Sequence, residues 1–116
     1  MAEIKNKYRI TVGSVFAEDY DTGVNFYQVT KITAGGCYAR RVRPKVIYDP
    51  TLSGGNRRMM PDYNNWDEKA KEKYYRVMQE NGSGHIYIVS TPGYAPYGRA
   101  YLWRGGSAIT TDPQFW

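Results

Sequence analysis

Residues 25–43 read NFYQVTKITAGGCYARRVR and carry the strongest strand signals of the chain. Asn25–Thr33 is rich in β-branched and aromatic residues, which favour an extended backbone. Ala34-Gly35-Gly36 supplies a glycine-rich turn. Residues 37–43 follow with side chains that alternate between two faces. We therefore expect an antiparallel hairpin over 25–43, which Pro44 interrupts or bends because proline cannot donate to a strand ladder.

Shorter β-prone runs surround this hairpin on both sides. They lie at 8–12, 14–17, 45–48, 85–90, 99–103 and 107–111, while 18–23 reads as an acidic turn and 51–65 is the loosest stretch. Five or six short strands at this spacing predict an α+β fold that is mostly β. The expected architecture is a small, strongly bent antiparallel sheet or an SH3-like barrel with one short helix, since closure protects sheet edges. A length of 116 residues fits one domain, 1–116.

The helix is expected from Trp66 to about Tyr75. Asn65 is a suitable N-cap and Glu68 stands at the capping-box position. Apolar residues then recur at helical spacing on one side. A competing interpretation stays open, because Lys73–Met78 is also β-prone and the following Asn-Gly-Ser-Gly sequence is able to turn it into the next strand. Residues 75–79 are therefore left as helix or strand.

The composition favours binding over chemistry. Twelve tyrosines accompany 16 Lys and Arg against 11 Asp and Glu, giving a net charge of +5. Such a balance favours approach to polyanions. Flat rings and cationic groups together suit stacking and charge contacts on nucleic acid or on an acidic protein face.

The cysteine count and the hydropathy limit the cellular compartments in which we expect the protein. Cys37 is the only cysteine, so an intrachain disulfide or a thiolate metal cluster is excluded and a small core residue is expected there. The N-terminal residues lack the apolar segment of a signal peptide, and no apolar run approaches the ~20 residues of a membrane span. We expect a soluble protein of the cytoplasm, with no membrane partner.

No group of residues specifies a reaction. His85 is the only histidine and has no nucleophile tied to it by a known motif spacing. The acidic run of Glu18, Asp19 and Asp21 does not match a calcium loop and is expected to be a solvated turn. The sequence therefore predicts a protein that is not an enzyme and holds no cofactor or metal.

The basic residues that follow the hairpin turn are the candidate contact surface. Alternation places Arg41 and Arg43 on one face of the strand and Arg40 on the other. Converging arginines are able to neutralise several phosphates, while nearby tyrosine rings stack on bases. The full set of expected binding residues is Arg40, Arg41, Arg43, Lys45, Arg57, Arg58, Tyr38, Tyr48, Tyr94 and Tyr97.

Two stretches carry a resemblance to a known group of proteins. Residues 12–16 read VGSVF and 22–29 read TGVNFYQV, while 100–106 read AYLWRGG after Tyr94. They resemble small uncharacterised proteins of bacteriophages, prophages and plasmids with a T-x-V-x-F-Y-Q-V motif and a late A-x-L-W-x-G motif. This chain departs from the pattern at Ser14, where an acid is common, and after Trp103. The resemblance implies a mobile-element origin and a β fold, and it brings no catalytic residues.

Two functions follow as expectations. The first is a non-enzymatic, phage-like binding protein that contacts nucleic acid through a basic, tyrosine-rich surface in a bacterial host cell. The second is a protein-binding inhibitor of a host defence system, similar to anti-CRISPR proteins, whose partner is a host nucleic-acid-binding complex. The sequence does not predict the oligomeric state.

Overall fold

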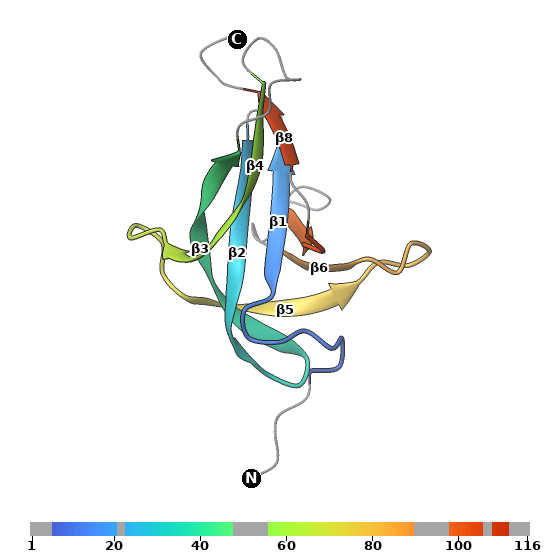
Figure 1. The fold of residues 1–116 in the computed structure, drawn as a ribbon. Coiled ribbons are helices and arrows are strands. Elements are labelled where there is room, and N and C mark those ends of the chain that lie inside the picture. The colour runs from blue at the N-terminus through green and yellow to red at the C-terminus, as the bar shows by residue number, and fades with distance from the viewer. Residues whose placement is uncertain (1–5, 21–22, 48–55, 90–97, 106–107, 112–116) are drawn as a thin grey trace.

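The chain folds almost entirely as strands. The computed structural model describes residues 6–20, 23–47, 56–89, 98–105 and 108–111. Figure 1 shows the arrangement, and the bounds are β1 (Val15–Tyr20), β2 (Gly23–Ile32), β3 (Gly36–Ile47), β4 (Asn56–Trp66), β5 (Lys73–Gln79), β6 (Ile86–Val89), β7 (Arg99–Leu102) and β8 (Ala108–Thr111). All neighbouring strands are antiparallel and belong to one sheet. The mostly β class and the antiparallel sheet are thus confirmed.

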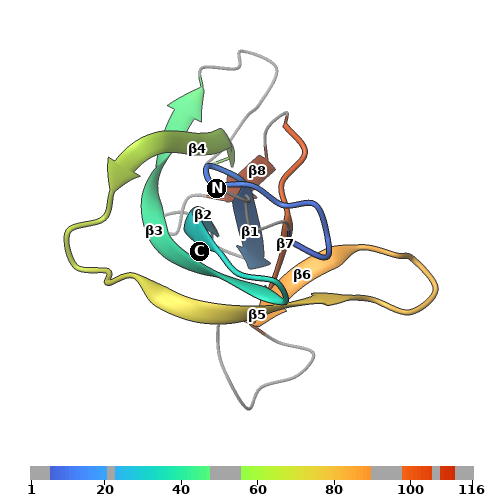
Figure 2. The same ribbon diagram turned by 90° about the horizontal axis from the view of Figure 1, so that it is seen from below.

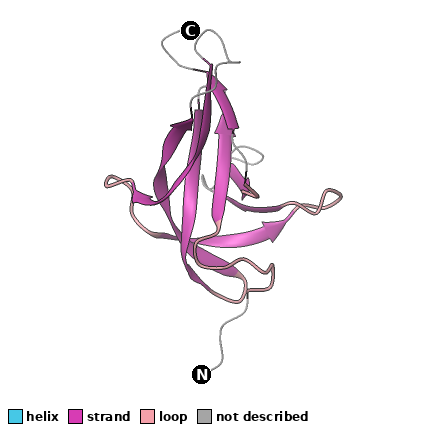
Figure 3. Ribbon diagram, in the orientation of Figure 1, coloured by secondary structure: helices cyan, strands magenta, loops and turns pink. Residues whose placement is uncertain are grey.

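The expected short helix is wrong. No helix occurs among the described residues, as Figure 3 shows. Trp66 ends β4, and Lys73–Gln79 is strand β5, which pairs with both β3 and β6. The competing β interpretation of Lys73–Met78 is the correct one. The strand is favoured because it buries Val77, which faces the core opposite Ile88 and is 1% exposed. A helix would remove Val77 from that position.

Three further expectations are corrected near the ends of elements. Residues 8–12 form turns and irregular backbone instead of a strand, and Arg9 has a positive φ of 62°. The acidic residues after Ala17 extend β1 as far as Tyr20 instead of forming a turn. The end of the loose stretch forms β4, because it finds partners in both β3 and β8.

Six of the strands close into a ring. The pairings run β2–β1–β7–β6–β5–β3, and β3 pairs back with β2. The β1–β7 contact is short, with Phe16 opposite Leu102 and an additional hydrogen bond from the Trp103 amide to the Val15 carbonyl. Figure 2 shows the strong curvature of β3 that this closure requires. We call this ring the barrel.

The barrel interior is a packed apolar core. Its buried members come from alternate positions of the ring strands, as the two-residue period of a strand requires. Ile10 joins them from the segment before β1. The core consists of Ile10, Phe16, Tyr27, Val29, Cys37, Ala39, Val77, Ile86, Ile88 and Ala100.

A second core lies on the other face of β1 and β2. Val15, Ala17, Val24, Phe26 and Val42 are buried there, packed against Met59, Trp66 and Trp103. The second half of β3 pairs with β4, and β4 pairs with β8, on this side of the sheet. The β3–β4 pairing has a register shift between Val42 and Pro44. The irregularity expected at Pro44 is therefore confirmed, although the strand continues beyond it to Ile47.

The segment before β1 is attached to the β2–β3 hairpin by a buried amide. Asn6 Nδ2 donates to the carbonyls of Thr33, at 2.8 Å, and Gly36, at 3.0 Å, while its Oδ1 accepts from the Tyr8 amide at 2.8 Å. Asn6 is only 6% exposed, so these bonds satisfy a polar side chain that would otherwise be costly to bury.

The buried thiol of Cys37 gives the stability a pH dependence. Burial raises the pKa of this thiol from 9.0 to about 11. Because the folded pKa exceeds the unfolded one, the stabilisation is complete below pH 9 and is lost as the pH rises through 11. Its size is at most about 3 kcal/mol. We expect the free-energy difference between wild type and Cys37→Ala, measured by urea unfolding, to shrink between pH 8 and 11. An unchanged difference would contradict this assignment.

Candidate nucleic-acid interface

One end of the barrel interior is polar. β2 and β3 place Tyr27 directly opposite Arg41 on the inward face. The next inward residues on the same strands are Val29 and Ala39, both fully buried. The apolar filling of the barrel therefore ends at the Tyr27–Arg41 pair, and charged groups begin there.

A loop, residues 67–72, joins β4 to β5 beside β3, next to the Tyr27–Arg41 pair. It leaves β4 where Trp66 pairs with Val42, and the Asp67 amide donates to the Arg41 carbonyl at 3.0 Å. Arg40 holds the loop from the outer face, with Nε donating to the Ala70 carbonyl at 3.0 Å and Nη2 to the Asp67 carbonyl at 3.3 Å. Its guanidinium also lies 5.7 Å from the centre of the Trp66 ring. Arg40 is thus used to fix the backbone.

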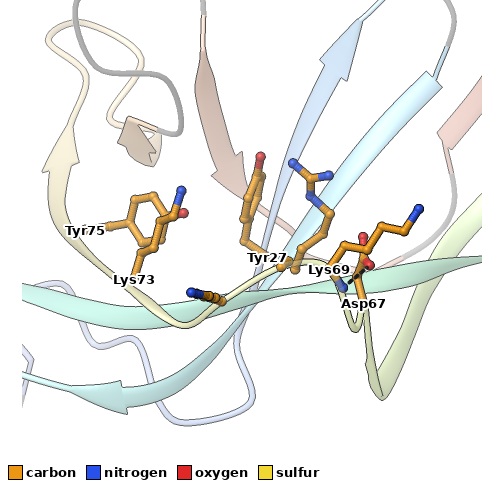
Figure 4. A pocket seen from close by; sticks show the side chains of 8 residues that line it. Tyr27, Asp67, Lys69, Lys73 and Tyr75 are labelled. Atoms are coloured by element: carbon orange, nitrogen blue, oxygen red, sulfur yellow. Dashed lines mark hydrogen bonds between the residues drawn. The ribbon is translucent and has the colours of Figure 1, made fainter.

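The loop and the barrel end enclose a pocket of about 300 Å³, which we call the mouth pocket. Four of its lining residues are cationic and one is acidic. In the view of Figure 4, Lys73 and Tyr75 lie on one side of Tyr27, and Asp67 and Lys69 on the other. The complete lining is Tyr27, Arg41, Asp67, Lys69, Ala70, Lys71, Lys73 and Tyr75.

Arg41 is the innermost cation of the mouth pocket. Its guanidinium lies 5.7 Å from the centre of the Tyr27 ring. Burial alone lowers the pKa of Arg41, but a hydrogen bond with Tyr27 and the nearby charges of Asp67 and Glu18 raise it above its usual value. The Nε atom is shut off from solvent and has no acceptor among the described residues. Arg41 therefore stays charged and keeps a donor that the described part of the protein does not use.

Two tyrosine rings form the aromatic wall of the pocket. Tyr27 and Tyr75 meet edge to face with ring centres 6.0 Å apart. Burial raises the pKa of Tyr75, so its hydroxyl is neutral at physiological pH and is able to donate. Glu18 accepts from the Tyr27 hydroxyl at 3.4 Å and from Asn25 Nδ2 at 3.1 Å, so the end of the Tyr27 side chain is held by a hydrogen bond.

The three lysines of the pocket form no ion pair with an acidic side chain of the described chain. Lys69, Lys71 and Lys73 are exposed, and the salt bridge found among the described residues joins Arg99 and Glu80 elsewhere. Exposed ammonium groups around a pocket stay hydrated in the free protein, and their positive charge is suited to attract an anion.

The expected binding residues fall into different environments. Arg41 lines the mouth pocket, Arg40 holds the loop, and Arg43 and Lys45 are exposed further along β3. Arg58 is half-buried opposite Ile47, and Arg57 lies in β4 opposite Thr110. Tyr38 packs edge to face on Tyr74, with ring centres 5.4 Å apart. Tyr48, Tyr94 and Tyr97 lie outside the described residues.

Seven of the eight pocket residues were not expected from the sequence: Tyr27, Asp67, Lys69, Ala70, Lys71, Lys73 and Tyr75. A local signal existed for the lysines. Residues 69–73 read KAKEK, with a cation at every second position. A helix would spread such residues around its axis, whereas in the structure residues 69–72 belong to a loop and Lys73 begins β5. The expected helix therefore concealed the cationic cluster.

The surroundings of His85 show no catalytic arrangement in the described part of the chain. Its ring meets Tyr101 edge to face at 6.2 Å, and Tyr101 donates to Glu80 at 2.8 Å. Glu80 also pairs with Arg99 at 3.2 Å. Among the described residues, no three His, Cys, Asp or Glu side chains cluster closely enough to hold a metal ion.

The described residues contain no helix long and apolar enough to cross a membrane. Compared with protein-family models, with curated proteins and with solved structures, the chain matches none of them.

Proposed function

We propose that the chain is a non-enzymatic binding protein that contacts nucleic acid through the mouth pocket and the basic surface beside it. The observation that carries the proposal is the grouping of Arg41, Lys69, Lys71 and Lys73 around two tyrosine rings. Cations of this number are suited to neutralise phosphates, and the rings offer faces on which bases stack. Arg43 and Lys45 extend the positive surface along β3.

The proposal includes the finer expectations of the sequence. The bent sheet is proposed to be of the SH3-like class, and its origin to be a phage, prophage or plasmid acting in the cytoplasm of a bacterial host. Support comes from the motif resemblance over 12–29 and 94–106 and from the mostly β fold.

Removing the three lysines of the mouth pocket is expected to weaken both nucleic-acid binding and the dependence of that binding on salt. In the variant Lys69→Gln/Lys71→Gln/Lys73→Gln, the slope of log K against log salt should fall by about 2 to 3, since each lost phosphate contact contributes about 0.7–0.9. Fluorescence anisotropy with labelled single- and double-stranded DNA and RNA, from 25 to 200 mM salt, measures this.

A variant with the same charge loss elsewhere serves as the control. Lys7, Arg9 and Arg76 are exposed and lie outside the pocket, so Lys7→Gln/Arg9→Gln/Arg76→Gln should retain most of the slope. Equal losses in both variants would show that only net charge matters. Flat titrations of the wild type at low salt with every nucleic acid would overturn the proposed function.

The alternative function, a protein-binding inhibitor of a host defence system, is favoured by exposed tyrosines outside the pocket. Tyr74 is 53% exposed beside Tyr38, and Tyr63 is 48% exposed. Exposed tyrosines are frequent energetic centres of protein interfaces. A stoichiometric complex that survives nuclease treatment and is lost in Tyr74→Ala would favour this function over nucleic-acid binding.

A further inference from the structure

The mouth pocket is closed at its inner end. Val29 and Ala39, the next inward residues below Tyr27 and Arg41, are fully buried in the packed barrel core. A ligand group that enters between the loop and the barrel therefore meets a floor and has no exit on the far side. A continuous polynucleotide is able to run across such an opening, but only a chain end is able to enter it.

The chemistry of the pocket favours a group with more than one negative charge. Four cations face Asp67 in the lining, and Glu18 lies near Arg41. An internal phosphodiester carries a single charge, whereas a phosphate monoester carries about −1.5 to −2 at neutral pH and offers three acceptor oxygens. Arginine forms paired hydrogen bonds with such a group.

The size of the pocket also suits one terminal unit. Its volume of about 300 Å³ is at the lower limit of ordinary ligand sites. The rings of Tyr27 and Tyr75 stand beside the cations and offer apolar surface to a sugar or base attached to the phosphate. The hydroxyl of Tyr75, kept neutral, adds a donor at the same wall.

We propose that the mouth pocket binds the terminal phosphate monoester of a nucleic-acid strand, with the Arg41 guanidinium at its floor and Lys69, Lys71 and Lys73 around its opening. This proposal rests on the proposed function, because it specifies which part of the nucleic acid the pocket recognises. Exposed cations outside the pocket, such as Arg43 and Lys45, contact the strand behind its end without reading that end.

The test compares four forms of one labelled single strand, made both as DNA and as RNA: 5′-phosphorylated, 3′-phosphorylated, phosphorylated at both ends, and with hydroxyl ends. One phosphorylated end is expected to bind at least about tenfold more tightly than the hydroxyl form at 50 mM salt, which corresponds to about 1.4 kcal/mol. The 5′ and 3′ forms identify which end is read. Inorganic phosphate and a nucleoside monophosphate, added as competitors, are expected to reduce the preference.

Two variants separate the pocket from general charge. Arg41→Lys keeps the charge but removes the fork, and it should abolish most of the preference; Lys71→Gln at the exposed loop should reduce it without a risk to folding. Arg76→Gln, exposed outside the pocket on the same strand as Tyr75, should leave the ratio between phosphorylated and hydroxyl forms unchanged.

The outcomes distinguish this inference from the function on which it rests. Equal, salt-sensitive affinity for all four forms would overturn terminal recognition and leave nucleic-acid binding in place. Absence of binding to every form would overturn both. Binding of inorganic phosphate or the nucleoside monophosphate without any oligonucleotide binding would also overturn both, because the pocket would then serve a small anion.

Discussion

Replacing Phe26 with alanine is expected to lower the free energy of unfolding by about 3–5 kcal/mol. Phe26 is fully buried in the second core and meets Trp103 edge to face, with ring centres 5.2 Å apart. The substitution removes a large apolar side chain and an aromatic contact from the place where β4 covers β1 and β2. Met59 and Trp66 pack against the same core, and the size of the loss depends on how far they move into the cavity.

Urea unfolding followed by circular dichroism measures this loss. Tyr63→Ala is the control, since Tyr63 is also a large aromatic residue of this layer but is 48% exposed. Its substitution should cost less than about 1 kcal/mol. A loss below 1 kcal/mol for Phe26→Ala as well would contradict the view that the second core holds β4 against the barrel.

Replacing Gly36 with alanine is expected to cost about 3 kcal/mol. A Cβ at this buried position would lie 2.6 Å from the Tyr75 carbonyl oxygen and 2.5 Å from the Tyr74 hydroxyl. The hydroxyl is the end of a side chain and is able to move, but the carbonyl belongs to β5, the strand paired with Gly36. Relief of the clash requires the β3–β5 ladder to separate, and overpacking of this kind is usually worth 1–3 kcal/mol or somewhat more.

The adjacent glycine provides a matched control for this prediction. A Cβ at Gly35 has no heavy atom within 4 Å, and Gly35 does not have a positive φ. Gly35→Ala should therefore change the stability by less than about 1 kcal/mol. Thermal unfolding of both variants beside the wild type measures the difference, and similar melting temperatures for the two would refute the close approach of β5 to Gly36.

The hairpin was predictable because its signals are local. The β-branched run of β2, the glycines of the turn and the alternation after Cys37 lie within about twenty residues of each other, and each favours the same structure. The β5–β6 region was less predictable because its signals conflict. Helical spacing and capping residues over 65–78 oppose a β-prone composition, and the pairing of β5 with β3 decides between them.

The candidate site, too, was predictable only where its signals are local. Arg41 was identified from its own strand, but the other cations of its pocket lie about thirty residues later, in the loop and at the start of β5. The hydrogen bonds from Arg40 to the Asp67 and Ala70 carbonyls bring that loop to β3, and such long-range contacts leave no local pattern. The period-two lysines were visible in the sequence, yet their grouping around the pocket depends on residues 67–72 forming a loop instead of a helix.

The closure of the barrel through β1 and β7 has a consequence for synthesis of the chain. Phe16 has to meet Leu102, and Ala17 has to meet Tyr101, before the ring is complete. A growing polypeptide on the ribosome therefore keeps an open sheet with two unsatisfied borders until β7 has emerged. Pairing of strands that are so far apart in the sequence is slow, and unpaired strand edges associate with other chains during the delay. Production at low temperature or with chaperones that shield nascent chains should consequently raise the yield of folded protein.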